Sequence, residues 1–337
     1  MTNLLDPAIL FFVVGAFAGL VKSNLEIPTP ISRFLSLYLL MALGLKGGFA
    51  LAQSGLTGQV ATSLGLAVGL AVLIPVLSYA VLSRFLSAFD AAAVAATYGS
   101  VSAVTFITAI GHLERTSVPF GGHMAAAMAL MESPAILLAV LMANALRRQR
   151  TAGLQATAGG AGIWAGPAQP QGGGFSLAKV LHESFTDGAQ LLLLGSMAVG
   201  VITGGPGQQA MQPFTGDLFK GLLAFFLLDM GLMAARNLPG LRGRSPWLVG
   251  YGLLAPLVHA GLALTLCLLV DIPAGDTALL MVLAASASYI AVPAVVRYAI
   301  PEANPSLYVG LSLGLTFPLN ILVGIPLYTE LALRLAG

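Results

Sequence analysis

The sequence predicts an all-α membrane protein of ten transmembrane helices, arranged as two inverted repeats of five helices each. Three observations support this prediction. Hydrophobic residues make up 57% of the 337 residues and charged residues only 8%, whereas about 25% of a soluble domain is charged. Features of the first half of the chain recur in the same order in the second half. A stretch rich in Gly, Ala and Gln, residues 148–176, separates the halves.

Each membrane-crossing helix needs roughly 20 apolar residues, and the hydrophobic runs predict ten such spans. They are residues 8–21, 31–52, 59–86, 90–112, 119–146, 178–203, 217–237, 246–270, 275–299 and 305–334. The composition of 148–176 predicts a flexible linker. The chain therefore divides into a first repeat over 1–147, the linker, and a second repeat over 177–337. The first residues lack a basic start, so we expect the first span to act as an uncleaved signal.

The fourth and ninth spans show the repeat residue by residue. At a shift of 186 positions, Ser100 falls on Ser286 and Ser102 falls on Ser288. Gly-Leu pairs, prolines and aspartates recur at similar shifts in the other spans. Because each repeat has an odd number of spans, the second repeat enters the membrane from the opposite side. The repeats are therefore predicted to be inverted.

Lysine and arginine residues orient the chain. With the linker in the cytoplasm, most of the 15 basic residues fall at cytoplasmic ends of spans. These residues are Lys22, Arg33, Arg84, Arg147, Arg148, Arg150, Lys179, Arg236, Arg242, Arg244 and Arg297. Basic residues concentrate on the cytoplasmic side of membrane proteins. We therefore expect a multi-pass protein of a bacterial cytoplasmic (inner) membrane, with a cytoplasmic linker and both termini outside.

Small polar residues interrupt the fourth and ninth spans at mid-depth. Gly99 and Pro293 weaken these helices, since glycine costs about 1 kcal/mol and proline about 3 kcal/mol in a helix interior. Interrupted helices at matching places in two repeats point to the binding site of a transporter. The second half-helices, which begin near Ala103 and Ile290, offer unpaired N–H groups and the positive end of a dipole. We predict that the two breaks cross and bind a small anion between them.

The predicted substrate-binding residues come from both breaks. They are Gly99, Ser100, Ser102, Ala103, Thr105, Ser286, Ser288, Tyr289 and Ile290. The alternative interpretation is that these small residues only allow the helices to pack closely.

An acidic residue, Glu132, lies deep in the predicted fifth span. An ionisable side chain at that depth is expensive and points to a functional site. Pro134 also frees the carbonyl of Leu130, and hard cations such as sodium prefer oxygen ligands. We predict a site for a coupling sodium ion, and no other cofactor, formed by Glu132, Ser102, Thr105 and Ser288. Proton coupling and a protonated, hydrogen-bonded glutamic acid remain the alternatives.

Two opposite charges, Lys46 and Asp229, lie within the second and seventh spans. They occupy nearly matching places in the two repeats and are predicted to form an ion pair, structural or gating. The sequence contains no phosphate-binding glycine loop and no group of nucleophile, base and orienting residue. We therefore expect neither ATP-driven transport nor an enzyme. The lack of a long basic tract also argues against nucleic acid as a partner.

Several stretches together resemble a known family. They are Gly99-Ser100-Val101-Ser102, Ser133-Pro134-Ala135-Ile136, residues 179–184, Glu302-Ala303-Asn304-Pro305-Ser306-Leu307-Tyr308-Val309-Gly310 and Gly324-Ile325-Pro326-Leu327. This set is similar to the sodium-dependent bicarbonate transporter family best known from cyanobacteria, of which the chain looks like a divergent member. The family pattern has Ser-Gly-Ser-Thr at residues 102–105, an aspartate at Tyr289 and an uncharged residue at Lys46.

The resemblance implies import of bicarbonate by sodium symport in a homotrimer. It also implies a scaffold of spans one, two, six and seven, a core of the remaining spans, and a PII-like regulatory protein on the cytoplasmic face. A sodium- or proton-coupled transporter of small organic carboxylates is the first alternative. A membrane anion sensor or scaffold for a cytoplasmic partner is the second. The repeats favour transport, because alternating access explains why two inverted halves flank one site.

Overall fold

The computed structural model of the chain describes residues 7–55, 57–158, 188–241 and 245–337, and over these residues it contains helices and no strand. Among them, seven helical stretches are long and apolar enough to cross a membrane. Two shorter apolar helices, Pro7–Leu20 and Ala274–Ala285, accompany these stretches. The prediction of an all-α membrane protein is confirmed at this level.

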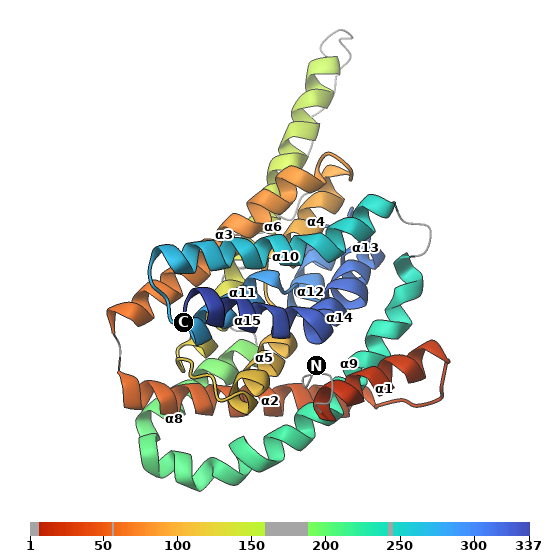
Figure 1. Cartoon of the computed structure of the whole chain (residues 1–337). Helices are drawn as coiled ribbons and strands as arrows, with labels where there is room; N and C mark the ends of the chain where they lie inside the picture. Colours follow the sequence, from red (N-terminus) through yellow and green to blue (C-terminus); the bar gives the residue numbers. More distant parts are fainter. Residues whose placement is uncertain (1–6, 56, 159–187, 242–244) are drawn as a thin grey trace.

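The helices follow the predicted spans in chain order (Figure 1). The α-helices are α1 (Pro7–Leu20), α2 (Thr29–Ser54), α3 (Gly58–Leu82), α4 (Ala88–Gly99), α5 (Ala103–Arg115), α6 (Met124–Ala158), α8 (Gly188–Gln212), α9 (Leu218–Asn237), α10 (Pro246–Leu269), α11 (Ala274–Ala285), α12 (Ala291–Ala299), α13 (Pro305–Val309), α14 (Phe317–Leu319) and α15 (Ile325–Leu335). Short turns of other helix types are η2 (Pro213–Asp217), η3 (Leu238–Leu241), η4 (Gly310–Thr316) and η5 (Asn320–Gly324).

The predicted linker begins as a helix. α6 continues to Ala158 and projects beyond the neighbouring helices (Figure 1). Eight of the 11 residues in 148–158 are Arg, Gln, Ala or Leu, which are strong helix formers, so the helix propagates past the predicted end of the span. The rest of the linker and the first part of the predicted sixth span lie outside the described residues.

Two groups of helices make up the fold. In the first group, α1 packs along α9 and α2 packs along α8, and these four helices lie together at the bottom of Figure 1. We call them the scaffold helices. In the second group, α3 packs on α4 and α6, while α10 packs on α11 and α11 packs on α15. We call α3–α6 and α10–α15 the core helices.

Glycines allow the scaffold helices to approach closely. A Cβ atom added at Gly231 of α9 would lie 2.1 Å from the carbonyl oxygen of Phe12 in α1. A Cβ atom at Gly48 of α2 would lie 2.1 Å from the carbonyl oxygen of Met197 in α8. Small residues of this kind let membrane helices pack backbone to backbone, which gives the scaffold two tightly joined helix pairs.

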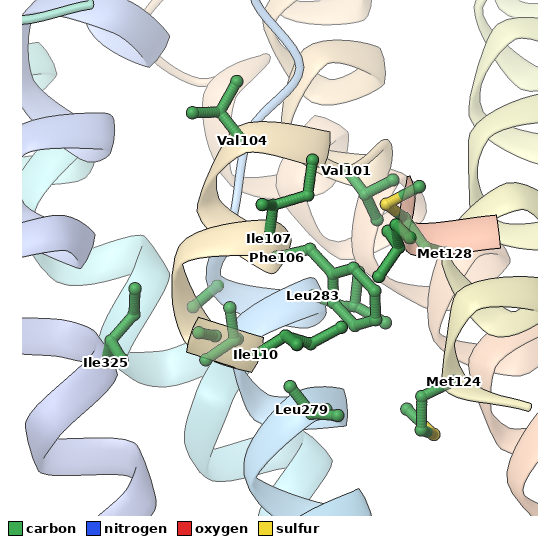
Figure 2. Close-up of a cluster of buried hydrophobic side chains, with 14 of the residues drawn as sticks. Val101, Val104, Phe106, Ile107, Ile110, Met124, Met128, Leu279, Leu283 and Ile325 are labelled. Atoms are coloured by element: carbon green, nitrogen blue, oxygen red, sulfur yellow. The ribbon is translucent and has the colours of Figure 1, made fainter. Parts of the chain in front are cut away.

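The fourth predicted span lies inside the protein. Of the most apolar part of Ala88–Arg115, 94% of the residues are buried, compared with 39% for Gly58–Leu82. α3 therefore offers much of its surface to lipid, whereas α4 and α5 are enclosed by protein. Figure 2 shows how α5 is held: its apolar side chains, including Phe106 and Ile110, pack against Met128 of α6 and Leu283 of α11.

Candidate functional site

The fourth span is broken between α4 and α5. α4 ends at Gly99, where an added Cβ atom would lie 2.5–2.7 Å from the ring atoms of Pro75 in α3. The chain then runs in an extended conformation through Ser100 to Ser102, and α5 begins at Ala103. The Ser102 Oγ atom accepts a hydrogen bond from the backbone N–H of Thr105 at 3.2 Å. Ser102 is thus the N-cap of the second half-helix.

The ninth span is broken in the same way. α11 ends at Ala285 and α12 begins at Ala291. The side-chain amide of Asn320 donates to the Ala285 carbonyl at 2.8 Å and satisfies the end of α11. The Ser288 Oγ atom accepts from the backbone N–H of Val292 at 3.2 Å. Pro293 lies in the first turn of α12, where a missing N–H leaves no acceptor unsatisfied, so it favours a helix start there.

The two breaks lie in direct contact. The backbone N–H of Ser102 donates to Ser286 Oγ at 3.0 Å, and the backbone N–H of Ser288 donates to the carbonyl of Thr97 at 2.9 Å. Ser286 Oγ in turn donates to the Leu283 carbonyl at 2.8 Å. These bonds join the first half of the chain to the second half at the point where both helices are interrupted.

The hydroxyls of Ser102 and Ser288 each accept a backbone N–H as a helix cap, and a serine hydroxyl also carries one hydrogen that it can donate. The Ser102 hydroxyl shares its hydrogen with the neighbouring Tyr289 hydroxyl, and Ser288 supplies a second hydroxyl hydrogen. At the start of α5, helix geometry leaves the N–H groups of Ala103 and Val104 without an acceptor inside the helix. The crossing therefore presents hydroxyl and backbone donors together, which is the chemistry that an oxyanion requires.

Two buried hydroxyl oxygens at the first break have no hydrogen-bond partner among the described residues. They are Ser100 Oγ and Thr105 Oγ1, and both side chains are almost fully enclosed. Buried polar atoms nearly always have a protein or water partner. Their environment therefore suits an ion, a substrate or a bound water.

The crossing is more exposed to solvent on one side than on the other. Ser102 and Ser288 are buried, but Ile290 is 56% exposed. The hydroxyl of Tyr289, next to it in the chain, lies 3.5 Å from Met230 Sδ and interacts with the Ser102 side chain. The open side of the crossing is thus the side of Ile290, where the second half-helix of the ninth span begins.

The predicted ion pair between Lys46 and Asp229 is wrong. Lys46 Nζ lies 2.9 Å from Glu114 Oε1, and the buried Asp229 carboxylate instead accepts a hydrogen bond from the Ser32 hydroxyl. Ser32 and Lys46 are both in α2, separated by 14 positions (46 − 32), which corresponds to about 21 Å along a helix. The similar places of these two residues in the two halves of the chain therefore do not bring their charges together.

Glu132 lies half-buried on α6, a helix that contacts both α4 and α12. Its role as a cation ligand stays a prediction. Sequence reasoning missed two residues that matter here. The side-chain amide of Asn320 binds the carbonyl at the end of α11. A polar amide within an apolar span is the sequence feature that points to this residue. Glu114 lies outside the predicted fourth span, which ends at residue 112, whereas α5 extends to Arg115.

A wide crevice of about 780 Å³ lies between α3 and α10, away from the two breaks. Apolar side chains such as Leu77, Val81, Leu254 and Val258 form most of its wall. Donors such as Arg84 and Tyr251 make up only a small part of the lining, so a small anion would lose much of its hydration against apolar side chains there. The crossing of the two breaks is therefore the better candidate for an anion site.

Comparison with known families agrees with the motifs. The model of the Na+-dependent bicarbonate transporter superfamily matches residues 7–333, which is nearly the whole chain. No curated protein matches the sequence.

Proposed function

Since the chain belongs to the Na+-dependent bicarbonate transporter superfamily, we propose that it imports bicarbonate together with sodium. Membership of a transporter family also means that the chain is not an enzyme. The observation that carries the proposal is the contact between the two breaks, which joins Ser102 to Ser286 and Ser288 to Thr97.

The proposed architecture is ten membrane crossings in two inverted repeats. Packing supports it, because each of the following contacts has an observed counterpart when both helices are replaced by the matching helices of the other repeat. α1 on α9 becomes α8 on α2, and α3 on α4 becomes α10 on α11; all four contacts occur. Inverted repeats of this kind place the substrate site at the interface between the halves, which is where the two breaks meet.

Bicarbonate would sit against the two half-helix starts. Its oxygens accept hydrogen bonds from the hydroxyls of Ser102 and Ser288 and from the N–H groups of Ala103 and Val104. Each helix start adds a partial positive charge equivalent to roughly half a unit. Neutral donors and dipoles together hold a singly charged anion without a basic side chain, so release does not require an ion pair to break.

Sodium would bind through oxygen atoms beside the anion. Thr105, Ser102 and Ser288 supply hydroxyl oxygens, and Glu132 supplies a carboxylate from α6. The unpartnered Thr105 oxygen supports this placement, because a buried oxygen without a donor is a ready ligand for a hard cation. A sodium ion at this place would attract the anion and couple the two fluxes.

The remaining features stay predictions. They are a homotrimer, a PII-like protein on the cytoplasmic face, location in a bacterial inner membrane, and termini outside the cytoplasm. A reporter that fluoresces only in the cytoplasm, fused after residue 337, should stay dark if the orientation is right. Bright signal would reverse the orientation.

Uptake by proteoliposomes tests the function. We expect labelled bicarbonate to enter when sodium is present outside, and uptake to fall when sodium is replaced by potassium. Acetate, lactate and pyruvate serve as competing carboxylates. If one of them is transported and bicarbonate is not, the protein is an organic carboxylate transporter. If no substrate enters but bicarbonate raises the melting temperature, an anion sensor is the better interpretation.

A further inference from the structure

A cavity with several polar side chains on its wall lies between the scaffold and core helices, separate from the two breaks. Its volume is about 300 Å³, at the lower end of the range for small-ligand pockets. The polar side chains on its wall come from both groups of helices. They are Lys46, Gln53, Glu114, Gln208, Gln212 and Thr215.

An ion pair spans this cavity. Lys46 projects from α2 of the scaffold, and Glu114 projects from the end of α5 of the core. The Lys46 Nζ atom lies 2.9 and 3.2 Å from the two carboxylate oxygens and 4.2 Å from the centre of the Phe219 ring. The side chains are 24% and 33% exposed, so water reaches the pair and screens it. The pair is therefore able to open.

The floor of the cavity is apolar. Ile110 and Met124 line the cavity and also belong to the cluster in Figure 2, which continues to Val101 and Val104 at the first break. This cluster separates the cavity from the crossing. The cavity is thus a compartment of its own, with Glu114 near the end of α5 on its wall.

We propose that this cavity is an entry site for a small carboxylate-like anion. Lys46 binds the anion, and Glu114 forms an ion pair with Lys46 when the anion is absent. The ion pair with Glu114 already places a carboxylate against the Lys46 ammonium group within the cavity. Gln53 donates its amide to Gln208 Oε1 at 2.9 Å, which leaves the Gln208 amide N–H groups to donate to a ligand. The direction of passage from this site to the crossing rests on the proposed function.

Reaction of an introduced thiol tests the site without any transport. The natural Cys267 is buried and is the single cysteine of the sequence, so Cys267→Ala provides the background. In Glu114→Cys, we compare the rates of an anionic sulfonatoethyl and a cationic trimethylammonioethyl methanethiosulfonate. Adding Lys46→Gln should slow the anionic reagent by about fivefold or more relative to the cationic one, from a charge interaction of at least about 1 kcal/mol.

Two matched variants control this measurement. Lys46→Arg keeps the charge and should keep the preference for the anionic reagent. Lys220→Gln removes an exposed charge from α9 and should leave the preference unchanged. Bicarbonate in the buffer should slow the anionic reagent when Lys46 is present. A ratio of the two rates that does not change in Lys46→Gln, or equal effects of Lys46→Gln and Lys220→Gln, would overturn the proposal.

Uptake kinetics separate a binding role from a structural one. If the pair only held the helices together, Lys46→Gln and Glu114→Gln would change uptake in the same direction. The entry site predicts opposite signs: Glu114→Gln frees the ammonium group and lowers KM, and Lys46→Gln raises KM. Charge preference without bicarbonate uptake would support the entry site and refute the proposed substrate, whereas uptake without charge preference would refute the entry site alone.

Discussion

The contact between Gly99 and Pro75 makes the first break a sensitive place for a single methyl group. In Gly99→Ala, the new Cβ atom would lie 2.5–2.7 Å from three ring carbons of Pro75, whereas carbon atoms prefer about 3.5–4.0 Å. The proline ring is rigid, and Gly99 does not have a positive φ. The cost is therefore one of packing alone, about 1–3 kcal/mol.

Gly111→Ala is the matched control, because it adds the same methyl group to the same span. Its new Cβ atom would meet Leu223 Cδ2 at 3.5 Å, an ordinary contact. Alanine within α5 should stabilise the helix by up to about 1 kcal/mol. We expect Gly111→Ala to melt at or above the temperature of the parent in detergent and to retain uptake.

Gly99→Ala should melt at a lower temperature and lose most uptake, because relief of the clash moves α4 away from α3 and shifts Ser100–Ser102. Both properties are measured on the same purified protein, by thermal unfolding and by uptake into proteoliposomes. If Gly99→Ala were as stable and as active as Gly111→Ala, the break would not depend on close packing against Pro75.

Other positions give separate tests. Ser102→Ala should raise KM for the transported anion about 2- to 12-fold, equivalent to about 0.5–1.5 kcal/mol, while Ser102→Thr should restore the hydroxyl; unchanged KM in the alanine variant would exclude Ser102 from the site. Glu132→Gln should abolish the dependence of uptake on sodium, or on pH if protons couple, and a normal dependence would make Glu132 structural. Asn320→Ala should lower stability by about 1–3 kcal/mol, because the Ala285 carbonyl and the Tyr328 hydroxyl lose their partner; unchanged melting would contradict this.

Local chemistry explains what the sequence could predict. The breaks follow from Gly99 and from the serines within apolar runs, and these are properties of single segments. The repeat then predicted that the two breaks would be equivalent, and the structure places them in contact through Ser102 and Ser286. The sequence pattern and the observed helix packing therefore agree for features that depend on a single segment and occur in both halves of the chain.

Which side chains of different helices meet depends on how the helices are placed relative to one another, and the sequence alone does not give this placement. The contact of Lys46 with Glu114 depends on the height and rotation of α2 relative to α5, and on one more turn of α5 than predicted. Asp229 is near the opposite end of α2 from Lys46, at Ser32. Equivalent places in two repeats predict similar environments, but they do not predict which opposite charges meet.

Hydrogen bonds also join the two halves of the chain at the helix starts that precede the breaks. Asp90 in the first turn of α4 accepts a hydrogen bond from the Asn304 N–H at 2.8 Å, and Asp276 in the first turn of α11 accepts from the Gly121 N–H at 2.6 Å. Asp90 and Asp276 are 186 positions apart and Gly121 and Asn304 are 183 apart (276 − 90; 304 − 121), so the exchange that relates the serines also relates these bonds.

Each aspartate ties the start of a broken span to the loop before a helix in the other half of the chain, α13 for Asp90 and α6 for Asp276. The crossing is then fixed at its centre by the serine contacts and beyond it by the aspartates. Unwinding the breaks to admit a substrate would disrupt several of these bonds at once. Relative movement of core and scaffold helices would leave all of them intact and would open only contacts between the two groups, and one of these contacts, the Lys46–Glu114 pair, is already partly exposed to solvent.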